Sequence, residues 1–288
     1  MDDARWAAMD RRTTLGLAGV AWAGAAASAR GAALPLEDPQ FHLLTLGRLQ
    51  GDLSGRPIYG YSRGRVFGVL PGAGLPLAES GWRLYDFEGG SITRSRRLPN
   101  GDIQSVSRTF LFYTDPETGA YLEEFRNPLT GRMVKVPPFR GGISASVQTL
   151  AGPKVTANFP MESTVFGRPP RLEFVGLGEH VVVTRHAFTR WTPRGAARAR
   201  TEFTQDDWVV RRADLADPRL TWLPAHHHWT SQTEWQAWLE MPEGQPGAQL
   251  WRSSGIRFHR LADLPDRFRA EADCRHPGIL TDPLPFPD

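Results

Sequence analysis

Strings of alternating apolar and polar residues run through the chain from Phe41 to about Arg212. A period of two residues is typical of β-strands, because successive side chains point to opposite faces of a sheet. In the string from Ile103 to Tyr113, one face carries Val106, Arg108, Phe110 and Phe112. In the string from His180 to Arg190, one face carries His180, Val182, Thr184, His186 and Phe188. Such mixed faces predict strands that border a partly polar cavity, with a two-sided sheet under some helical cover as the alternative.

Turn motifs separate these strings at short intervals. Asn100-Gly101 is a strong hairpin signal. Asp115-Pro116-Glu117-Thr118-Gly119 and Asn127-Pro128-Leu129-Thr130-Gly131 are near copies, in which Asx accepts a turn hydrogen bond, proline restricts φ and glycine allows a positive φ. Their spacing leaves room for one strand, Ala120 to Arg126. We therefore predict a mainly β fold, an antiparallel meander that closes into a lipocalin-like barrel, with a sandwich as the alternative.

Helical periodicity appears only late in the chain. Ser231 or Thr233 can cap a short helix from Glu234 to Met241, which Pro242 ends. Asp263 can cap a second helix from Leu264 to about Cys274, with Pro265 in its first turn. The proline-rich tail from Gly278 to Asp288 is expected to lie as an extended strap on the surface.

Residues 1–33 differ from the rest of the chain. Arg11-Arg12 precedes an uncharged run from Leu15 to Ala29, which is too short and too weakly apolar for a membrane span. The segment resembles a twin-arginine export signal, although Thr14 and Gly16 stand where Phe and Lys are commonest. An ordinary N-terminal helix is the alternative, but the run has no polar helical face. We predict an export signal in residues 1–33, the twin-arginine machinery as a partner, a periplasmic or otherwise exported location, and one β-rich domain in residues 34–288.

Composition narrows the classes of function. The chain is 40% hydrophobic and 23% charged, which is ordinary for a globular protein. The single cysteine, Cys274, excludes an intrachain disulfide and a cysteine-based zinc site. The net charge is +3, and the arginines alternate with acids instead of forming one basic stripe, so we expect no nucleic-acid partner. The chain contains no dinucleotide-binding, phosphate-binding or nucleophile-elbow motif, so we expect no cofactor.

The histidines are the first candidates for chemistry. On a strand, His226 and His228 point to one side and His227 to the other. With His180 or His186 they can form a three-histidine metal site, but their spacing matches no metal motif, and we predict no metal.

Acid–base chemistry needs a histidine and a carboxylate that converge in a cavity. Glu202 and Asp206 lie on an expected strand and can supply the carboxylate. The catalytic candidates are His186 or His228 as the general base and Arg108 as the cation that stabilises negative charge. The alternative for each group is pairing on the outer face of the sheet.

Aromatic residues are concentrated in the second half, where six of the ten tryptophans lie between Trp208 and Trp251. Such a set suits a pocket that stacks an aromatic or apolar ligand and offers indole N–H donors. The ligand-binding candidates are Trp208, Trp229, Trp235, Trp238, Tyr113 and His180.

Several motifs together resemble a known family. They include Leu49-Gln50-Gly51-Asp52-Leu53-Ser54-Gly55-Arg56-Pro57, Phe125-Arg126-Asn127-Pro128-Leu129-Thr130-Gly131, Trp235-Gln236-Ala237-Trp238 and His276-Pro277-Gly278. The chain resembles the bacterial family known as domain of unknown function 1838. The resemblance implies a β-rich, lipocalin-like barrel and an export leader, and it implies no activity.

The leading hypothesis is an exported β-barrel protein that binds a small hydrophobic or aromatic molecule in a Trp-rich pocket. A cofactor-independent lyase, isomerase or hydrolase with a cavity histidine as general base is the second. A histidine-ligated metalloenzyme is the third. We do not expect an integral membrane protein.

Overall fold

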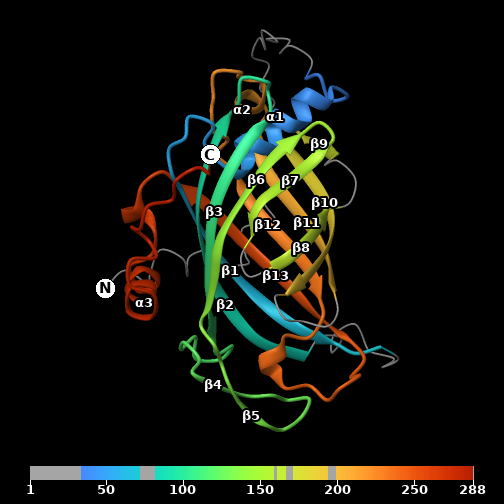
Figure 1. Ribbon diagram of the computed structural model, residues 1–288, viewed down its shortest axis with the longest axis vertical. Coiled ribbons are helices and arrows are strands. Elements are labelled where there is room, and N and C mark those ends of the chain that lie inside the picture. Colours follow the sequence, from blue (N-terminus) through green and yellow to red (C-terminus); the bar gives the residue numbers. More distant parts are fainter. Residues whose placement is uncertain (1–33, 72–81, 159–160, 167–170, 194–198, 288) are drawn as a thin grey trace, which may run out of the picture. The chain divides into compact units, whose positions relative to one another are not determined.

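Most of the described chain belongs to one antiparallel β-sheet (Figure 1). The computed structural model describes residues 34–71, 82–158, 161–166, 171–193 and 199–287. Within them, eleven strands form this sheet, and β4 and β5 form a separate hairpin. The strands are β1 Ile58–Val69, β2 Trp82–Arg97, β3 Ile103–Thr114, β4 Glu124–Arg126, β5 Met133–Lys135, β6 Phe139–Thr149, β7 Gly152–Asn158, β8 Met161–Phe166, β9 Leu172–Leu177, β10 His180–Pro193, β11 Arg200–Arg211, β12 His226–Thr233 and β13 Ala248–Phe258. The helices are α1 Pro39–Gln50, α2 Arg212–Ala216 and α3 Asp266–Arg275, with 3-10 turns η2 Ala237–Leu239 and η3 Leu261–Asp263.

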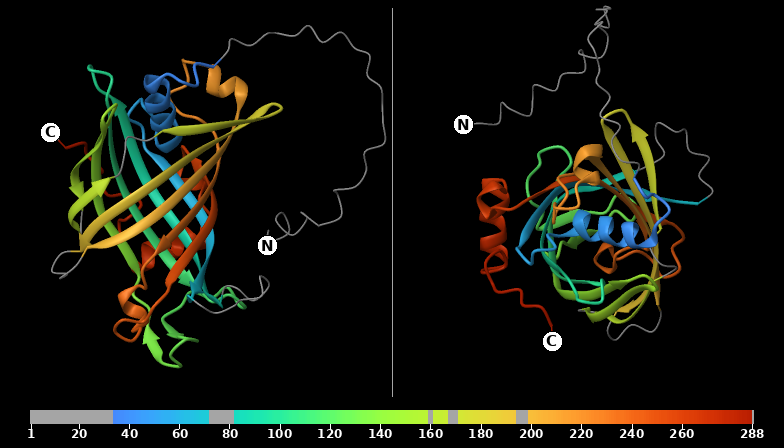
Figure 2. Two further views of the ribbon diagram at one scale, coloured as in Figure 1. Left: turned by 90° about the vertical axis from the view of Figure 1, so that its right-hand side faces the viewer. Right: turned by 90° about the horizontal axis from the view of Figure 1, so that it is seen from above.

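The strand order brings distant parts of the chain together. The path is β7-β6-β3-β2-β1-β13-β12-β11-β10-β8, and β9 also pairs with β10. Seen from above, the strands curl around α1 (Figure 2). The predicted mainly β, antiparallel fold is confirmed, but the closed barrel is not. β8 pairs only with the end of β10, and no ladder joins β8 to β7 in the described residues, so the sheet is open and curved.

The turns predicted at Asn100, Asp115 and Asn127 are confirmed. Gly101 has φ 89° in the turn between β2 and β3, and Gly119 and Gly131 have φ 69° and 72° in the two copied turns. In the first copy, the Asp115 carboxylate accepts a 2.7 Å hydrogen bond from the Thr118 backbone N–H. Local turn chemistry therefore places these reversals correctly, although the strand expected from Ala120 shortens to β4.

One helix, α1, occupies a region where strands were expected, so the prediction of strands from Phe41 onward is wrong there. Asp38 caps α1 by accepting a hydrogen bond from the Gln40 N–H, and Pro39 stands in its first turn, where a missing N–H costs nothing. Leu46 and Leu49 of α1 are fully buried in an apolar cluster with Trp208 and other residues of β10 and β11. We call the face of the sheet that contacts α1 the inner face and the opposite face the outer face.

The outer face of β1–β3 is covered by α3 and the C-terminal strap. Phe268 of α3 is fully buried, and its ring stacks on Phe110 with a centroid distance of 5.6 Å. Arg108 is also buried there, and its Nη1 donates a 2.9 Å hydrogen bond to the Ile279 carbonyl oxygen of the strap. α3 begins two residues later than predicted, and Asp263 lies in η3 instead of capping it.

An apolar cluster fills the end of the sheet opposite α1. Here β4, β5 and η2 contribute Phe125, Val134 and Leu239, which pack against inner-face aromatics of β2, β3 and β13. The helix predicted from Glu234 to Met241 is only the single turn η2. It stays short because the Gln236 N–H bonds to the Gln249 side chain and Glu240 takes a left-handed conformation with φ 50°.

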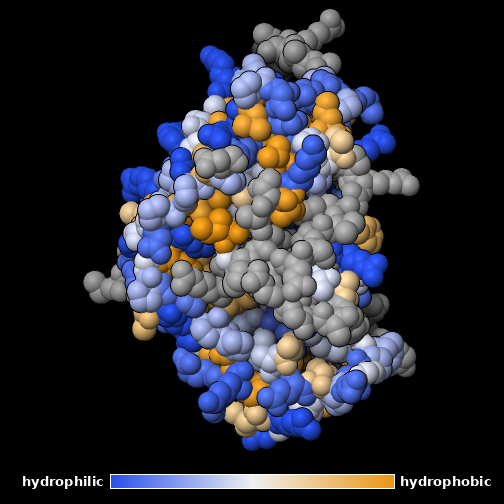
Figure 3. Space-filling model, in the orientation of Figure 1, coloured by the Kyte–Doolittle hydropathy of each residue, from blue (hydrophilic) through white to orange (hydrophobic). Residues whose placement is uncertain are grey.

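Apolar patches are interspersed with hydrophilic residues on the face shown in Figure 3. The large exposed apolar side chains of the described residues are Met133, Phe139, Ile143, Leu150, Val175, Leu177 and Phe188. Most of them lie on or next to β6, β9 and β10, toward the two ends of the strand path. All helices among the described residues fall short of the length and apolar character that a transmembrane span requires.

Candidate functional site

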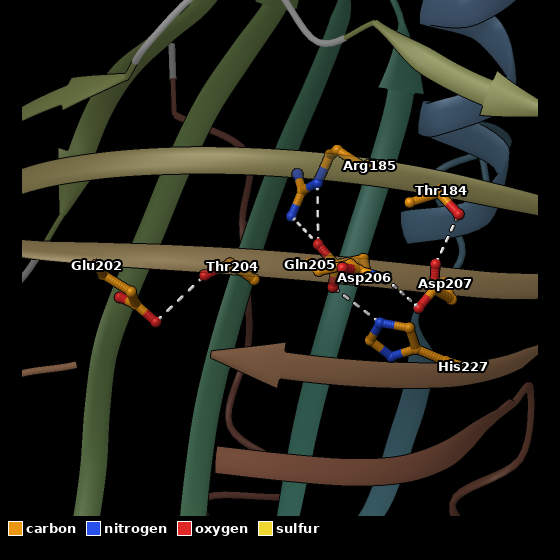
Figure 4. A network of polar contacts seen from close by, with 8 residues as sticks. All are labelled: Thr184, Arg185, Glu202, Thr204, Gln205, Asp206, Asp207 and His227. Atoms are coloured by element: carbon orange, nitrogen blue, oxygen red, sulfur yellow. Dashed lines mark hydrogen bonds and ion pairs between the residues drawn. The ribbon is translucent and has the colours of Figure 1, made fainter. Parts of the chain in front are cut away.

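Charged side chains meet on the inner face between the two apolar ends. Arg185 of β10 stands opposite Asp206 of β11, and His227 of β12 stands opposite Trp208. The Asp206 carboxylate joins the neighbouring strands, because one oxygen accepts a 2.9 Å hydrogen bond from Arg185 Nε and the other lies 2.9 Å from His227 Nε2 (Figure 4). Arg257 of β13 completes a group that we call the inner polar cluster: Arg185, Asp206, His227 and Arg257.

Burial and charge set the ionisation of this cluster. Burial alone would raise the pKa of Asp206, but the Arg185 charge and the His227 hydrogen bond outweigh it and lower the pKa to about 2. Burial lowers the pKa of His227, against the raising effect of its hydrogen bond to Asp206. Asp206 is therefore a carboxylate at neutral pH, and His227 favours its neutral form.

Arg257 is the least satisfied member of the cluster. Its Nη1 is shielded from solvent and has no hydrogen-bond partner among the described residues. Burial lowers the pKa of Arg257 to about 10, while the charge of Asp206 partly offsets this effect. The guanidinium stays charged at neutral pH, and a cation whose Nη1 is shielded and unpaired is costly unless something else binds it.

A second carboxylate, Glu202, lies farther along β11. Its Oε1 accepts hydrogen bonds from Ser231 Oγ at 2.5 Å and from Thr204 Oγ1 at 3.3 Å. Burial raises the pKa of Glu202, and the hydroxyl hydrogen bonds only partly oppose this. Glu202 and Thr233 line a pocket of about 460 Å³ where β10, β11 and β12 approach the end opposite α1.

The strands that face this cluster carry small residues. In register, the inner face of β1, β2 and β3 presents Gly60, Ser62, Gly89, Ser91, Ser107 and Thr109. Although Thr109 belongs to the inner face, it is solvent-exposed, whereas its neighbours Arg108 and Phe110 are buried on the outer face under α3 and the strap. The inner face of β3 is therefore open to molecules the size of water.

Tryptophans continue this inner surface. Trp208 stacks on His227 with a centroid distance of 5.1 Å and an interplanar angle of 10°. Trp229 lies 6.2 Å from Trp251 and 6.4 Å from Phe87 between ring centroids. The indole N–H groups of Trp208 and Trp251 are buried and have no hydrogen-bond partner among the described residues. The inner face thus has a partly exposed ring at Trp229, backed by buried aromatic residues whose N–H groups are unpaired among the described residues.

The predicted catalytic residues are not brought together. Arg108 holds the C-terminal strap, whereas His186 and His228 lie on the outer face of other strands. The His186 side chain is 40% exposed and stacks on Phe203. His180 is exposed at the start of β10.

His228 lines the largest described pocket, of about 1280 Å³, on the outer face. Its Nδ1 lies 2.9 Å from Ser254 Oγ, and Asp207 stands opposite it on β11. Ser254, His228 and Asp207 therefore lie side by side, as in a serine–histidine–aspartate triad. The Asp207 oxygens, however, accept hydrogen bonds from Thr184 and Gln205 and not from His228. The arrangement lacks the histidine–carboxylate bond that orients a catalytic triad.

The predicted ligand-binding residues divide between two places. Trp208 is buried under α1 next to the polar cluster, and Trp229 is partly exposed on the inner face. Trp235, Trp238 and Tyr113 belong to the apolar cluster at the end opposite α1, where Tyr113 Oη and Trp238 Nε1 both donate to Gln236 Oε1, at 2.9 and 2.6 Å.

Sequence reasoning missed His227, Arg185 and Arg257. The alternation along β12 correctly separates His227 from His226 and His228, but it does not say which side is the inner one. Arg257 carries no local signal, since it reaches the cluster only through the pairing of β13 with β1 and β12. No group of three or more His, Cys, Asp or Glu suited to a metal ion is found in the part of the chain that the structure describes.

A family model described as protein of unknown function (DUF1838) matches residues 58–286. No match was found among curated proteins. The matched range contains the whole inner polar cluster, the facing strands and the inner-face tryptophans.

Proposed function

The chain belongs to the DUF1838 family, whose description specifies no activity, and we propose from its geometry that it binds a small hydrophobic or aromatic molecule on the inner face of the curved sheet. In this proposal the sheet acts as a lipocalin-like container between the α1 end and the η2 end. Residues 1–33 would deliver it to an exported location.

One observation carries the proposal: between its two filled ends the inner face has an exposed position, Thr109, and a partly exposed tryptophan, Trp229. Ligand sites are concave, mostly apolar and supplied with a few polar groups that fix orientation. Trp229, which is partly exposed, offers apolar surface and is backed by the buried rings of Trp251 and Phe87. The inner-face residues of β1–β3 are small.

The test uses N-phenyl-1-naphthylamine, a neutral fluorescent probe of apolar sites. The wild-type protein is expected to enhance its fluorescence with saturation at one site. Thr109→Trp places a large side chain on the exposed inner position of β3 and should abolish the enhancement. Ile143→Trp is the matched control, because Ile143 lies on the outer face of the adjacent strand β6 and is 39% exposed.

Two results would contradict the proposal. One is the absence of saturable enhancement with the wild-type protein. The other is equal enhancement by Thr109→Trp and the wild type. Native mass spectrometry of untagged protein from an exporting host provides a second readout, since a stoichiometric organic adduct should be present in the wild type and absent from Thr109→Trp.

A second candidate function, general base catalysis without a cofactor, is favoured by the His227–Asp206 pair. A carboxylate that bonds one ring nitrogen fixes the tautomer and leaves the other nitrogen for proton transfer. If the protein is an enzyme, we expect His227→Gln to lower turnover of the natural substrate by about 10²–10⁴-fold, and His228→Gln to leave it within about threefold. The reverse order would assign the chemistry to the outer pocket.

A further inference from the structure

The inner polar cluster carries an excess of positive charge. Arg185 and Arg257 are both cations at neutral pH, and Asp206 is the carboxylate between them. Both Asp206 oxygens already accept hydrogen bonds, one from Arg185 and the other from His227. Arg257 therefore has Asp206 only as a nearby charge and not as a hydrogen-bond partner among the described residues.

Glu202 does not balance this charge. Its position on β11 is four residues from Asp206, which separates the two by about 13 Å along the strand. Its carboxyl group is bonded to Ser231 and Thr204, and burial raises its pKa toward the neutral form. One positive charge is left over at the α1 end of the inner face.

The unused polar groups of this surface are mainly donors. The shielded and unpartnered atoms include Arg257 Nη1, Trp208 Nε1 and Trp251 Nε1, which donate and do not accept. An uncharged apolar ligand would leave the Arg257 guanidinium unsatisfied, at a cost of about 1–3 kcal/mol or more. A carboxylate satisfies a guanidinium best, because its two oxygens match the planar N–H fork.

The position of Arg257 gives the ligand a direction. Arg257 and Trp251 are six residues apart on β13, or about 20 Å along the strand. Trp229 lies between them in register, opposite Ser253. An acidic group at Arg257 would therefore direct an apolar body away from α1, along Gly255 and Ser253, toward the aromatic rings.

We infer that the ligand of this site is an organic monocarboxylate, with its carboxylate on Arg257 and its apolar or aromatic body against the partly exposed ring of Trp229. This inference rests on the proposed function and specifies its ligand class. In this inference Arg257 binds the carboxylate, and Asp206, Arg185 and His227 form the polar network beside it.

The test compares 2-naphthoate with 2-naphthamide, which has nearly the same shape and no charge. Each displaces N-phenyl-1-naphthylamine from the wild type, from Arg257→Gln and from Arg252→Gln at constant ionic strength. Arg252 is the matched control, because it lies on the same strand β13 but is exposed on the outer face. We expect 2-naphthoate to bind the wild type and Arg252→Gln at least about tenfold more tightly than the amide, equivalent to about 1.4 kcal/mol, and Arg257→Gln to reduce the ratio to within about twofold.

The neutral probe separates the two proposals. If the probe binds but the acid and the amide displace it equally, or if Arg257→Gln keeps the preference, the carboxylate inference is overturned while the proposed function stands. Unchanged probe binding by Arg257→Gln shows that this variant is folded. If the probe does not bind, thermal denaturation measures the binding of 2-naphthoate directly. 2-Naphthoate should raise the Tm of the wild type and not that of Arg257→Gln. If it neither raises the Tm of the wild type nor displaces the probe, the inference is overturned.

Discussion

Replacing Asp206 by asparagine tests whether the inner polar cluster is as tightly coupled as its geometry indicates. The substitution keeps the size of the side chain and removes the charge that Arg185 and His227 both contact. Each pKa unit corresponds to about 1.4 kcal/mol, so lowering the Asp206 pKa from 3.8 to about 2 is equivalent to about 2.5 kcal/mol of native-state stability at neutral pH. Loss of the buried ion pair also leaves Arg185 and Arg257 without a counter-charge, so we expect a total loss of about 3–4 kcal/mol.

The assay is equilibrium unfolding in urea at neutral pH, with Asp207→Asn as the matched control. Asp207 is the next residue on β11 and points to the outer face, where its oxygens bond only the neutral groups of Thr184 and Gln205. Its substitution should cost about 1 kcal/mol or less. If Asp206→Asn lowers the free energy of unfolding by less than Asp207→Asn does, the reasoning on the inner cluster is refuted.

The wild type and Asp206→Asn should also differ in how their stability depends on pH. The folded pKa of Asp206 lies below its ordinary value, so its contribution is complete above that value and is lost as the pH falls through about 2. Between about pH 5 and pH 2, the stability of the wild type should therefore fall more steeply than that of Asp206→Asn. Parallel curves over this range would refute the coupling.

Three further predictions concern other parts of the molecule. The pKa of His227 is lowered in the folded protein, so on acidification the unfolded state binds a proton first and the free energy of unfolding should fall below about pH 6.5. His227→Gln should flatten this part of the pH profile measured by urea unfolding, and an unchanged profile would contradict the prediction. Phe268→Ala should cost about 3–5 kcal/mol, because it opens a cavity beside Phe110, and a loss below about 1 kcal/mol would show that α3 does not hold the outer face. Arg108→Gln should accelerate hydrogen exchange in residues 279–287, measured by mass spectrometry of peptic peptides, because the strap loses the hydrogen bond from Arg108 to the Ile279 carbonyl. Probe binding on the inner face should stay unchanged.

Local signals account for much of the fold. The alternation in β3 and β10 and the Asx-Pro-Gly turns at Asp115 and Asn127 depend on residues within a few positions of one another, and the structure confirms them. The start of α1 also has a local signal, Asp38-Pro39, in which Asp38 caps the helix and Pro39 stands in its first turn. Closure of the sheet is different in kind, since it depends on whether β7 and β8 form a ladder, and no short pattern specifies that pairing.

The candidate site shows the same division. By itself, the sequence determined that His227 faces away from His226 and His228, because side chains on a strand alternate, and that the second half of the chain supplies many tryptophans. Only the tertiary structure decided which side is the inner one, since that follows from the positions of α1 and α3 on opposite faces. It also placed Arg257 beside His227 and left Arg108 under the strap, because both outcomes come from contacts between residues far apart in the chain. Side-chain alternation is a property of one strand, whereas a site is made where several strands pair.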